Sequence, residues 1–297
     1  MRYISIYVLA LMFFACDNKQ ANKSATAEVT KILVDESFAP IIDDQFLVFE
    51  NSYPQERIKL IYEPEVKLMN ELLSGKVNLV IMSRKLLSSE QEGFEKKNIH
   101  VLNYPIATDA ITLITHQSSK DSTITVDELK EILKGSSAQR SLVFDNPNSS
   151  TVRYLKEMSQ ITELPKKGVY ALKSTEDVIK YVYNNPGTIG VIGYNWMKQP
   201  TVELEPLVKK LKNLGVKNGE GLKGADKFYK PSQDNLALGL YPLSRNLYFV
   251  DCTGGTARNS FAAFITGERG QRLMLKAGLL PVSMPPREII LRKKITK

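Results

Sequence analysis

Short apolar runs alternate with amphipathic stretches along the chain from residue 31 onward. Apolar runs of about four to eight residues have the length of buried strands, and apolar residues spaced three and four apart line one face of a helix. The short runs predict strands over residues 31–34, 57–62, 77–82, 110–116, 141–144, 188–192 and 246–250. The spaced stretches predict helices over 40–49, 64–73, 125–135, 174–185, 202–214, 256–265 and 267–276, with two more after Ser88 and after Thr151. This alternation predicts an α/β fold with a largely parallel sheet.

Polar residues at the expected helix starts support these boundaries. Thr125 followed by Glu128 forms a capping box, in which each side chain bonds the other residue's backbone N–H. Ser88 or Ser89 is expected to cap the helix that follows it in the same way. We therefore expect these helices to begin at Ser or Thr caps.

The first residues have the pattern of a targeting signal. Arg2 precedes an apolar run over residues 3–15, and Cys16 follows directly. This run is shorter than the roughly 20 apolar residues that a membrane-spanning helix needs. A Cys directly after a small residue resembles the end of a bacterial lipoprotein signal. We expect residues 1–15 to be a signal peptide, Cys16 to be lipidated and residues 16–29 to be a polar tether. Plain secretion is the alternative.

Charge and length set broad limits. The 297 residues, 43% of them hydrophobic, are enough for two lobes that each bury a core. The net charge of +8 comes from scattered Lys and Arg rather than a basic stripe interleaved with aromatic residues. We therefore expect no nucleic-acid partner and at most a weak preference for anions.

Catalytic and metal-binding patterns are not found in the sequence. His100 and His116 are the two histidines of the chain and lie far apart, so we expect no metal site and no other cofactor. Ser149 or Ser150 could act as a nucleophile, but no sequence motif identifies either His as its general base. Cys252 is expected to be a buried small residue. We do not expect an enzyme.

Three polar turns follow predicted strands. They are Asp35-Glu36-Ser37, Ser83-Arg84 and Asn148-Ser149-Ser150-Thr151. Ligands of open α/β sheets bind beyond the carboxyl ends of the strands, where these turns would meet. Hydroxyls, helix-start N–H groups and an Arg suit a small oxyanion. The plain alternative for the third turn is an Asn-Pro turn with a Ser N-cap.

The order of several segments carries a resemblance. The segments are residues 36–41, Ser83-Arg84, residues 148–151, residues 188–194 and residues 264–278 with Gly270-Gln271. In this order the chain resembles the phosphate-binding proteins of bacterial phosphate ABC importers, and more closely their lipoprotein branch. The resemblance covers about residues 30–285.

The resemblance implies a fold and a domain layout. The fold would be the two-lobed periplasmic-binding-protein fold of type II, in which each lobe is a mixed, mostly parallel sheet flanked by helices. Two hinge crossings, near residues 106–113 and 241–250, would join the lobes. Residues 30–108 and 246–297 would form lobe 1, and residues 109–245 would form lobe 2. The resemblance also implies a monomer that binds inorganic phosphate outside the cytoplasm and delivers it to the membrane permease of an ABC importer.

The resemblance also implies site residues. The ligand-binding set carried over from the family is Glu36, Ser37, Ser83, Arg84, Ser149, Ser150 and Thr151. Ser37 would donate from the first turn and Ser83 or Arg84 from the second. The third turn would grip the anion from lobe 2 with a helix dipole behind it.

The sequence departs from the family at charged positions. Asp145 stands where the better-known branch has an Arg, and Arg84 stands where that branch has an Asp. Glu36, Asp35 or Asp145 could accept the proton of hydrogen phosphate, which sulfate lacks near neutral pH. Alternatively these carboxylates are structural, capping turns or pairing with Arg153 or Arg84. The altered charges also leave open another oxyanion, a phosphorylated metabolite, or a sensor or interaction lipoprotein that does not transport.

Overall fold

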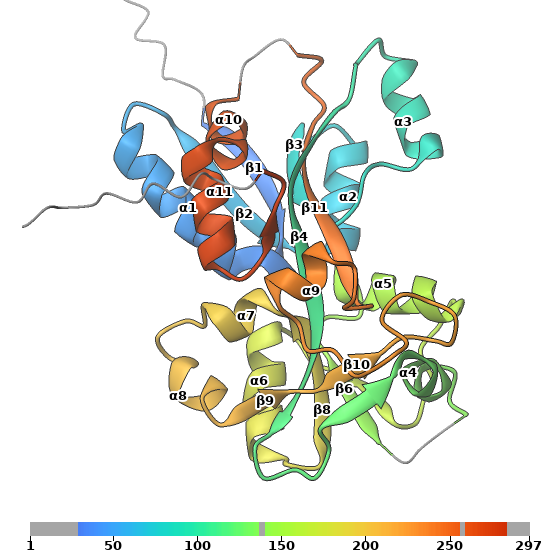
Figure 1. Ribbon diagram of the computed structural model, residues 1–297. Helices are drawn as coiled ribbons and strands as arrows, with labels where there is room; N and C mark the ends of the chain where they lie inside the picture. The colour runs from blue at the N-terminus through green and yellow to red at the C-terminus, as the bar shows by residue number, and fades with distance from the viewer. Residues whose placement is uncertain (1–28, 137–139, 256–258, 284–297) are drawn as a thin grey trace, which may run out of the picture.

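The computed structural model describes residues 29–136, 140–255 and 259–283 (Figure 1). The predicted signal peptide, Cys16 and all but the last residue of the predicted tether lie outside these ranges. Two lobes stand one above the other, and strand β4 (Leu102–His116) runs through both (Figure 1). In the described part of the chain, the helices fall short of the length and apolar character needed to cross a bilayer.

The first lobe is built on one half of the sheet. Its strands lie in the order β2-β1-β3-β11-β4, where β1, β2 and β3 are parallel and β11 is antiparallel to both β3 and β4. The strands besides β4 are β1 (Thr30–Asp35), β2 (Ile58–Glu63), β3 (Leu79–Met82), β11 (Ser244–Asp251) and β12 (Leu280–Pro281). The helical segments are η1 (Glu36–Phe38), α1 (Ala39–Ser52), α2 (Glu65–Leu73), α3 (Ser88–Glu95), α10 (Ser260–Thr266) and α11 (Glu268–Lys276).

The second lobe continues the sheet from the far half of β4 in the order β4-β8-β6-β7. Its strands are β6 (Ser141–Phe144), β7 (Val169–Ala171), β8 (Thr188–Gly193) and β9 (Leu211–Asn213), with β5 (Thr123–Thr125) and β10 (Gly215–Lys217) forming a separate parallel pair. Its helices are α4 (Val126–Leu133), α5 (Ser150–Ser159), α6 (Thr175–Asn184), α7 (Asn195–Lys198), α8 (Glu205–Val208) and α9 (Gln233–Ala237).

Continuous burial explains why the central strands β3 and β8 are apolar at nearly every position. All four residues of β3 and all six of β8 are buried, because helices cover both faces of the sheet. Gly190 in β8 lies so close to α6 that a Cβ there would be 2.7 Å from Val182 Cγ2. The mixed, helix-covered α/β fold expected from the sequence is confirmed.

The interval 202–214 was predicted as one helix, and this is wrong. Only Glu205–Val208 is helical, and Leu211–Asn213 forms β9, antiparallel to the far end of β4. Leu204, Val208, Leu211 and Leu214 do have helical spacing and are all buried. Pairing with the free edge of β4 nevertheless prevails over that local pattern.

Two other helix starts differ from the prediction. The N-cap of α3 is Leu87 rather than Ser88 or Ser89, and the Glu90 carboxylate accepts the Leu87 N–H at 2.7 Å. The Glu90 carboxylate therefore caps the helix in place of a serine hydroxyl, and Arg84 holds the same carboxylate by donating a hydrogen bond to it. Helix α10 begins at Ser260, and the predicted start at residue 256 lies outside the described residues.

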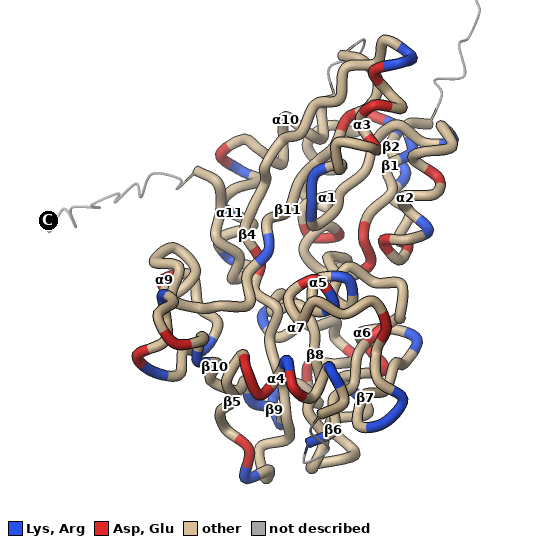
Figure 2. The backbone as a smooth tube through the Cα atoms, turned by 90° about the vertical axis from the view of Figure 1, so that its right-hand side faces the viewer, with Lys and Arg blue, Asp and Glu red and all other residues tan. Residues whose placement is uncertain are grey.

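Basic and acidic positions are interspersed over both lobes when the molecule is turned by 90° (Figure 2). No single basic stripe follows one element of the described chain in this view (Figure 2). The charges that matter for the site therefore have to be found by their contacts.

Candidate functional site

Two of the predicted turns meet between the lobes. Ser37 follows β1 and Ser150 follows β6, so each stands beyond the carboxyl end of a parallel strand. Their hydroxyl oxygens lie 3.4 Å apart across the junction. Both residues are at most 1% exposed. The junction thus gathers hydroxyl groups in a place that solvent does not reach.

Local hydrogen bonds fix both turns. Asp35 Oδ1 accepts the Ser37 N–H at 3.0 Å and holds the single turn of η1. Ser149 caps α5 by accepting the Val152 N–H at 3.2 Å, and its own hydroxyl donates to Asp145 Oδ1 at 2.5 Å. The Ser N-cap reading of the third turn is therefore confirmed. Asp35 caps η1, and Asp145 accepts the hydroxyl hydrogen bond of the capping Ser149.

Arg245, which the sequence analysis missed, lies at the centre of this junction. From β11 its Nη1 donates to Ser150 Oγ at 2.9 Å and to Thr151 Oγ1 at 3.3 Å. Its Nε and Nη2 donate to Asp109 Oδ2 at 3.2 and 3.1 Å. The guanidinium carbon also stands 4.5 Å from the centroid of the Phe38 ring, a cation–π contact. A buried, well-held guanidinium beside hydroxyl donors is suited to an oxyanion.

Three buried carboxylates, those of Asp35, Asp109 and Asp145, interact with this guanidinium, and the half-buried Glu36 lies near Asp145 and Asp35. Burial is the largest cause of a raised pKa at each of them: Asp109 to about 6, Asp145 and Glu36 to about 7, and Asp35 upward. Arg245 opposes the rise in the pKa of Asp35, Asp109 and Asp145, while the carboxylates raise one another's pKa values. Proton binding is therefore easier here than at an exposed carboxyl group.

Three carboxylate oxygens at this junction have no hydrogen-bond donor among the described residues. They are Asp35 Oδ2, Glu36 Oε1 and Asp109 Oδ1, and all three are buried. Buried acceptors normally have a partner. These oxygens are consequently free to accept hydrogen bonds from a ligand.

Ser83 and Arg84 lie at one rim of the junction and contact a different carboxylate. The Arg84 guanidinium pairs with Glu90 at 2.7 and 2.9 Å, and its Nε lies 3.3 Å from Glu65 Oε1. Ser83 Oγ donates to Glu65 Oε2 at 3.3 Å and accepts from Arg153 Nη2 at 2.9 Å. The structure thus places these two predicted site residues in a network centred on Glu65.

That network joins the lobes. Arg153 on α5 binds Glu65 on α2 through Nε at 2.5 Å and Nη2 at 3.2 Å. Beside it the Val66 N–H donates to the Asn148 carbonyl at 3.2 Å. We call Glu65, Ser83, Arg84 and Arg153 the Glu65 clasp. Arg84 pairs with Glu65 and Glu90, and Arg153 pairs with Glu65 and Glu157. In the described chain neither guanidinium forms an ion pair with Asp35, Glu36 or Asp145.

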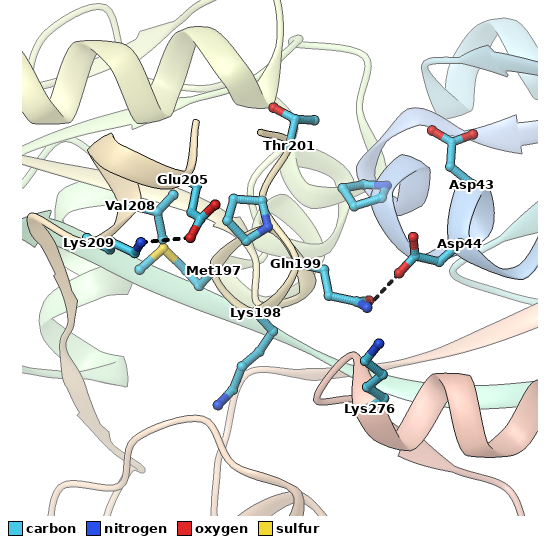
Figure 3. Close-up of a pocket in the computed structure, with 12 residues that line it drawn as sticks. Asp43, Asp44, Met197, Lys198, Gln199, Thr201, Glu205, Val208, Lys209 and Lys276 are labelled. Atoms are coloured by element: carbon cyan, nitrogen blue, oxygen red, sulfur yellow. Dashed lines mark hydrogen bonds and ion pairs between the residues drawn. The ribbon is translucent and has the colours of Figure 1, made fainter. Parts of the chain in front are cut away.

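The opposite rim is also closed by contacts between lobes. Asn195 Nδ2 and Trp196 Nε1 donate to the Ser37 carbonyl at 3.2 and 3.0 Å. Gln199 Nε2 donates to Asp44 Oδ2 at 2.6 Å beside a cavity of about 770 Å³ (Figure 3). Contacts between the lobes therefore lie on both sides of Arg245, whose side chain is 2% exposed.

A signal for Arg245 was present in the sequence. Successive side chains of a strand point to opposite faces, so Arg245 and Leu247 of β11 share a face. Both are buried. A charged residue at an inward-facing position is rarely buried without a partner, and Asp109 is the cross-strand neighbour of Arg245 in the sheet. The predicted strand began at residue 246 and so left out Arg245, and the pair of Arg245 and Asp109 was therefore not recognised.

Comparisons with known proteins identify the family of the chain and agree with its fold. Residues 19–269 match the family model of the PBP superfamily domain. "Protein SphX" of Synechococcus elongatus is 25% identical over 232 residues, covering 70% of this chain and 64% of the relative. "Phosphate-binding protein PstS" of Staphylococcus haemolyticus is 23% identical over 223 residues, covering 71% of this chain and 66% of the relative. The match therefore spans slightly less than two thirds of these relatives.

A solved structure shares the fold over most of the chain. It is a substrate-binding protein assigned to a phosphate ABC transporter of Clostridium perfringens, determined with bound phosphate. The TM-score is 0.70 at 18% identity, and the alignment covers 86% of this chain and 100% of that chain. This likeness establishes a common fold.

Proposed function

Because the chain belongs to the PBP superfamily, we propose that it binds inorganic phosphate outside the cytoplasm and delivers it to the permease of an ABC importer. The observation that carries the proposal is the buried Arg245, which donates to Ser150 and Thr151 where the two lobes meet. The names of the curated relatives and the phosphate bound in the structural neighbour support the choice of anion. The protein is proposed to act without catalysis.

Arg245 and most of the predicted residues then have distinct roles. Arg245 would balance the charge of the anion, and Ser37, Ser150 and Thr151 would donate hydroxyl hydrogen bonds to it. Ser149 would hold the start of α5, whose N–H groups and dipole favour an anion. Ser83 and Arg84, through the Glu65 clasp, would stabilise the closed form around the ligand.

Opening of the lobes is part of the proposal. The units that move would be residues 30–108 with 246–297 and residues 109–245. The crossings near 106–113 and 241–250 would act as hinges. Residues 1–15 would be removed as a signal peptide, and a monomer would be held at the membrane by lipid on Cys16.

Calorimetric titration of phosphate into residues 17–297, with sulfate as the control anion, tests the function. This segment contains every described residue. We expect micromolar or tighter phosphate binding, roughly −8 kcal/mol or better, and no comparable heat with sulfate. The absence of phosphate binding would overturn the proposal, and preferential sulfate binding would favour the other-oxyanion hypothesis.

A pair of variants locates the site. Ser150→Ala removes one donor and should weaken phosphate binding by about 1 kcal/mol, roughly fivefold. Ser232→Ala is the matched control, because Ser232 caps α9 through the Asn235 N–H and, within the described chain, forms no hydrogen bond with Ser150 or Arg245. Equal affinities for both variants would contradict the placement of the ligand.

A further inference from the structure

The carbonyl oxygen of Ser37 accepts two side-chain hydrogen bonds from the other lobe. Asn195 Nδ2 donates to it at 3.2 Å and Trp196 Nε1 donates to it at 3.0 Å, both from α7. All three residues are buried. A residue of the first lobe, whose hydroxyl is assigned to the ligand, therefore has its backbone held from the second lobe.

The backbone of Ser37 is fixed on both sides of the residue. Its N–H donates to Asp35 Oδ1 within η1, and its carbonyl accepts from Asn195 and Trp196 across the junction. Holding the two peptide groups that flank Ser37 restricts its φ and ψ, so the position of the hydroxyl depends only on the choice of rotamer. In the structure this hydroxyl lies 3.4 Å from Ser150 Oγ. Without the two donors from α7, one side of this arrangement would be free to turn.

The side chain of Asn195 is polar at a place where an apolar one would leave no unpaired atom. Its Oδ1 is buried and has no hydrogen-bond donor in the described part of the chain, which is unfavourable for an amide. A Cβ at position 193 would lie 3.0 Å from Asn195 Nδ2, so Gly193 leaves room for this amide. The same Cβ would lie 3.4 Å from both Arg245 Nη2 and Asp109 Oδ2. The amide thus stands close to the central ion pair, and its donor is used on Ser37.

Resting on the proposed function, we propose that Asn195 and Trp196 are positioning residues of the phosphate site. When the lobes close, their donors fix the peptide groups of Ser37, so that its hydroxyl points to the anion held by Arg245 and Ser150. The second lobe thereby completes a binding turn of the first lobe without touching phosphate through these two side chains. In separated lobes both hydrogen bonds are lost, because the donors and the acceptor belong to different lobes.

A double-mutant cycle tests the positioning role. Calorimetry compares phosphate binding by residues 17–297 without substitution, with Trp196→Phe, with Ser37→Ala and with both changes. We expect Trp196→Phe alone to weaken binding by about 2-fold to 12-fold, the effect of losing one neutral hydrogen bond. In the Ser37→Ala background the same change should have little effect, because no Ser37 hydroxyl remains to be oriented. An equal loss in both backgrounds, or no loss in either, would overturn the inference.

Controls separate positioning from a general loss of structure. Tyr229→Phe removes an aromatic side-chain donor that binds Asp226 within the second lobe, and it should bind phosphate normally. A loss in this control equal to that in Trp196→Phe would also overturn the inference. Urea unfolding without phosphate identifies the variants that fold. If Trp196→Phe does not, Asn195→Ala removes the other donor and gives the same cycle with Ser37→Ala. Absence of phosphate binding by the chain without substitutions would overturn the proposed function and with it this inference.

Discussion

Replacing Arg153 by Met removes the guanidinium through which α5 holds Glu65 of the other lobe. We expect phosphate binding to weaken by about 5-fold to 150-fold, although Arg153 need not touch the ligand. The reason is that the lobes must close around phosphate, and affinity falls with the fraction of closed protein.

The magnitude follows from the contacts of Glu65. Its side chain is 4% exposed, whereas that of Arg153 is 25% exposed. Removing one partner of a buried pair typically costs about 3–5 kcal/mol, because a charge is left buried and alone. Here Arg84 and Ser83 remain at 3.3 Å from the same carboxylate. We therefore expect about 1–3 kcal/mol, in the range of a charged hydrogen bond, and tenfold in affinity for each 1.4 kcal/mol.

Calorimetry gives the affinity, and small-angle X-ray scattering with and without phosphate reports whether the lobes still close. Lys180→Met is the matched control, because Lys180 forms an exposed pair with Glu203 inside the second lobe. Such surface pairs contribute little. If Arg153→Met bound phosphate as tightly as Lys180→Met and kept the same scattering, the Glu65 clasp would have no role in closure.

Three further results are expected. Arg245→Lys keeps the charge but loses the forked guanidinium that donates to both Asp109 and the hydroxyl groups, so calorimetry should show roughly 100-fold weaker phosphate binding. The control Arg269→Lys, at an exposed position, should bind phosphate normally. Equal affinities of the two variants would refute the role assigned to Arg245. Asp109→Asn removes the carboxylate that pairs with Arg245 across the sheet but leaves Asp35 and Asp145 near the guanidinium, so it should lower the free energy of unfolding by about 1.5–3 kcal/mol in urea; no measurable loss would contradict this. Burial raises the pKa of Asp145 from 3.8 to about 7, so the folded ligand-free chain binds this proton more tightly than the unfolded chain, and its melting temperature should fall as the pH rises through that interval. Asp145→Asn should show a shallower decline, and an identical slope would refute the attribution.

Where both faces of a strand are buried, the sequence predicts the element well. The runs at β3 and β8 are apolar at nearly every position, so no alternative pairing or exposed face competes with the strand. At residues 202–214 the local signal is equally regular but misleading. Leu211 is spaced as in a helix yet is buried by pairing beside β4, a contact that depends on residues about 100 positions away.

The site shows the same division between local and long-range information. Ser37, Ser149 and Asp35 were found because turns and caps are formed by residues close in sequence. Arg245 and Asp109 act together only because the register of β11 on β4 sets them opposite each other. Neither residue has a local motif, so an alignment of the two crossing strands would have been needed to join them.

The path of β4 and β11 has a consequence for the order in which the chain can fold. The buried members of the largest core cluster of the second lobe all fall between Ala110 and Leu243, one continuous segment. In the first lobe, Ile32 and Phe49 pack with Phe261 and Met274, from opposite ends of the chain. As the chain emerges with its N-terminus first, the second lobe can complete its core while the first still lacks β11, α10 and α11. The first lobe has the longer-range contacts and should form last. Pulse-labelling hydrogen exchange during refolding should therefore show protection of β6 and β8 before that of β1 and β2.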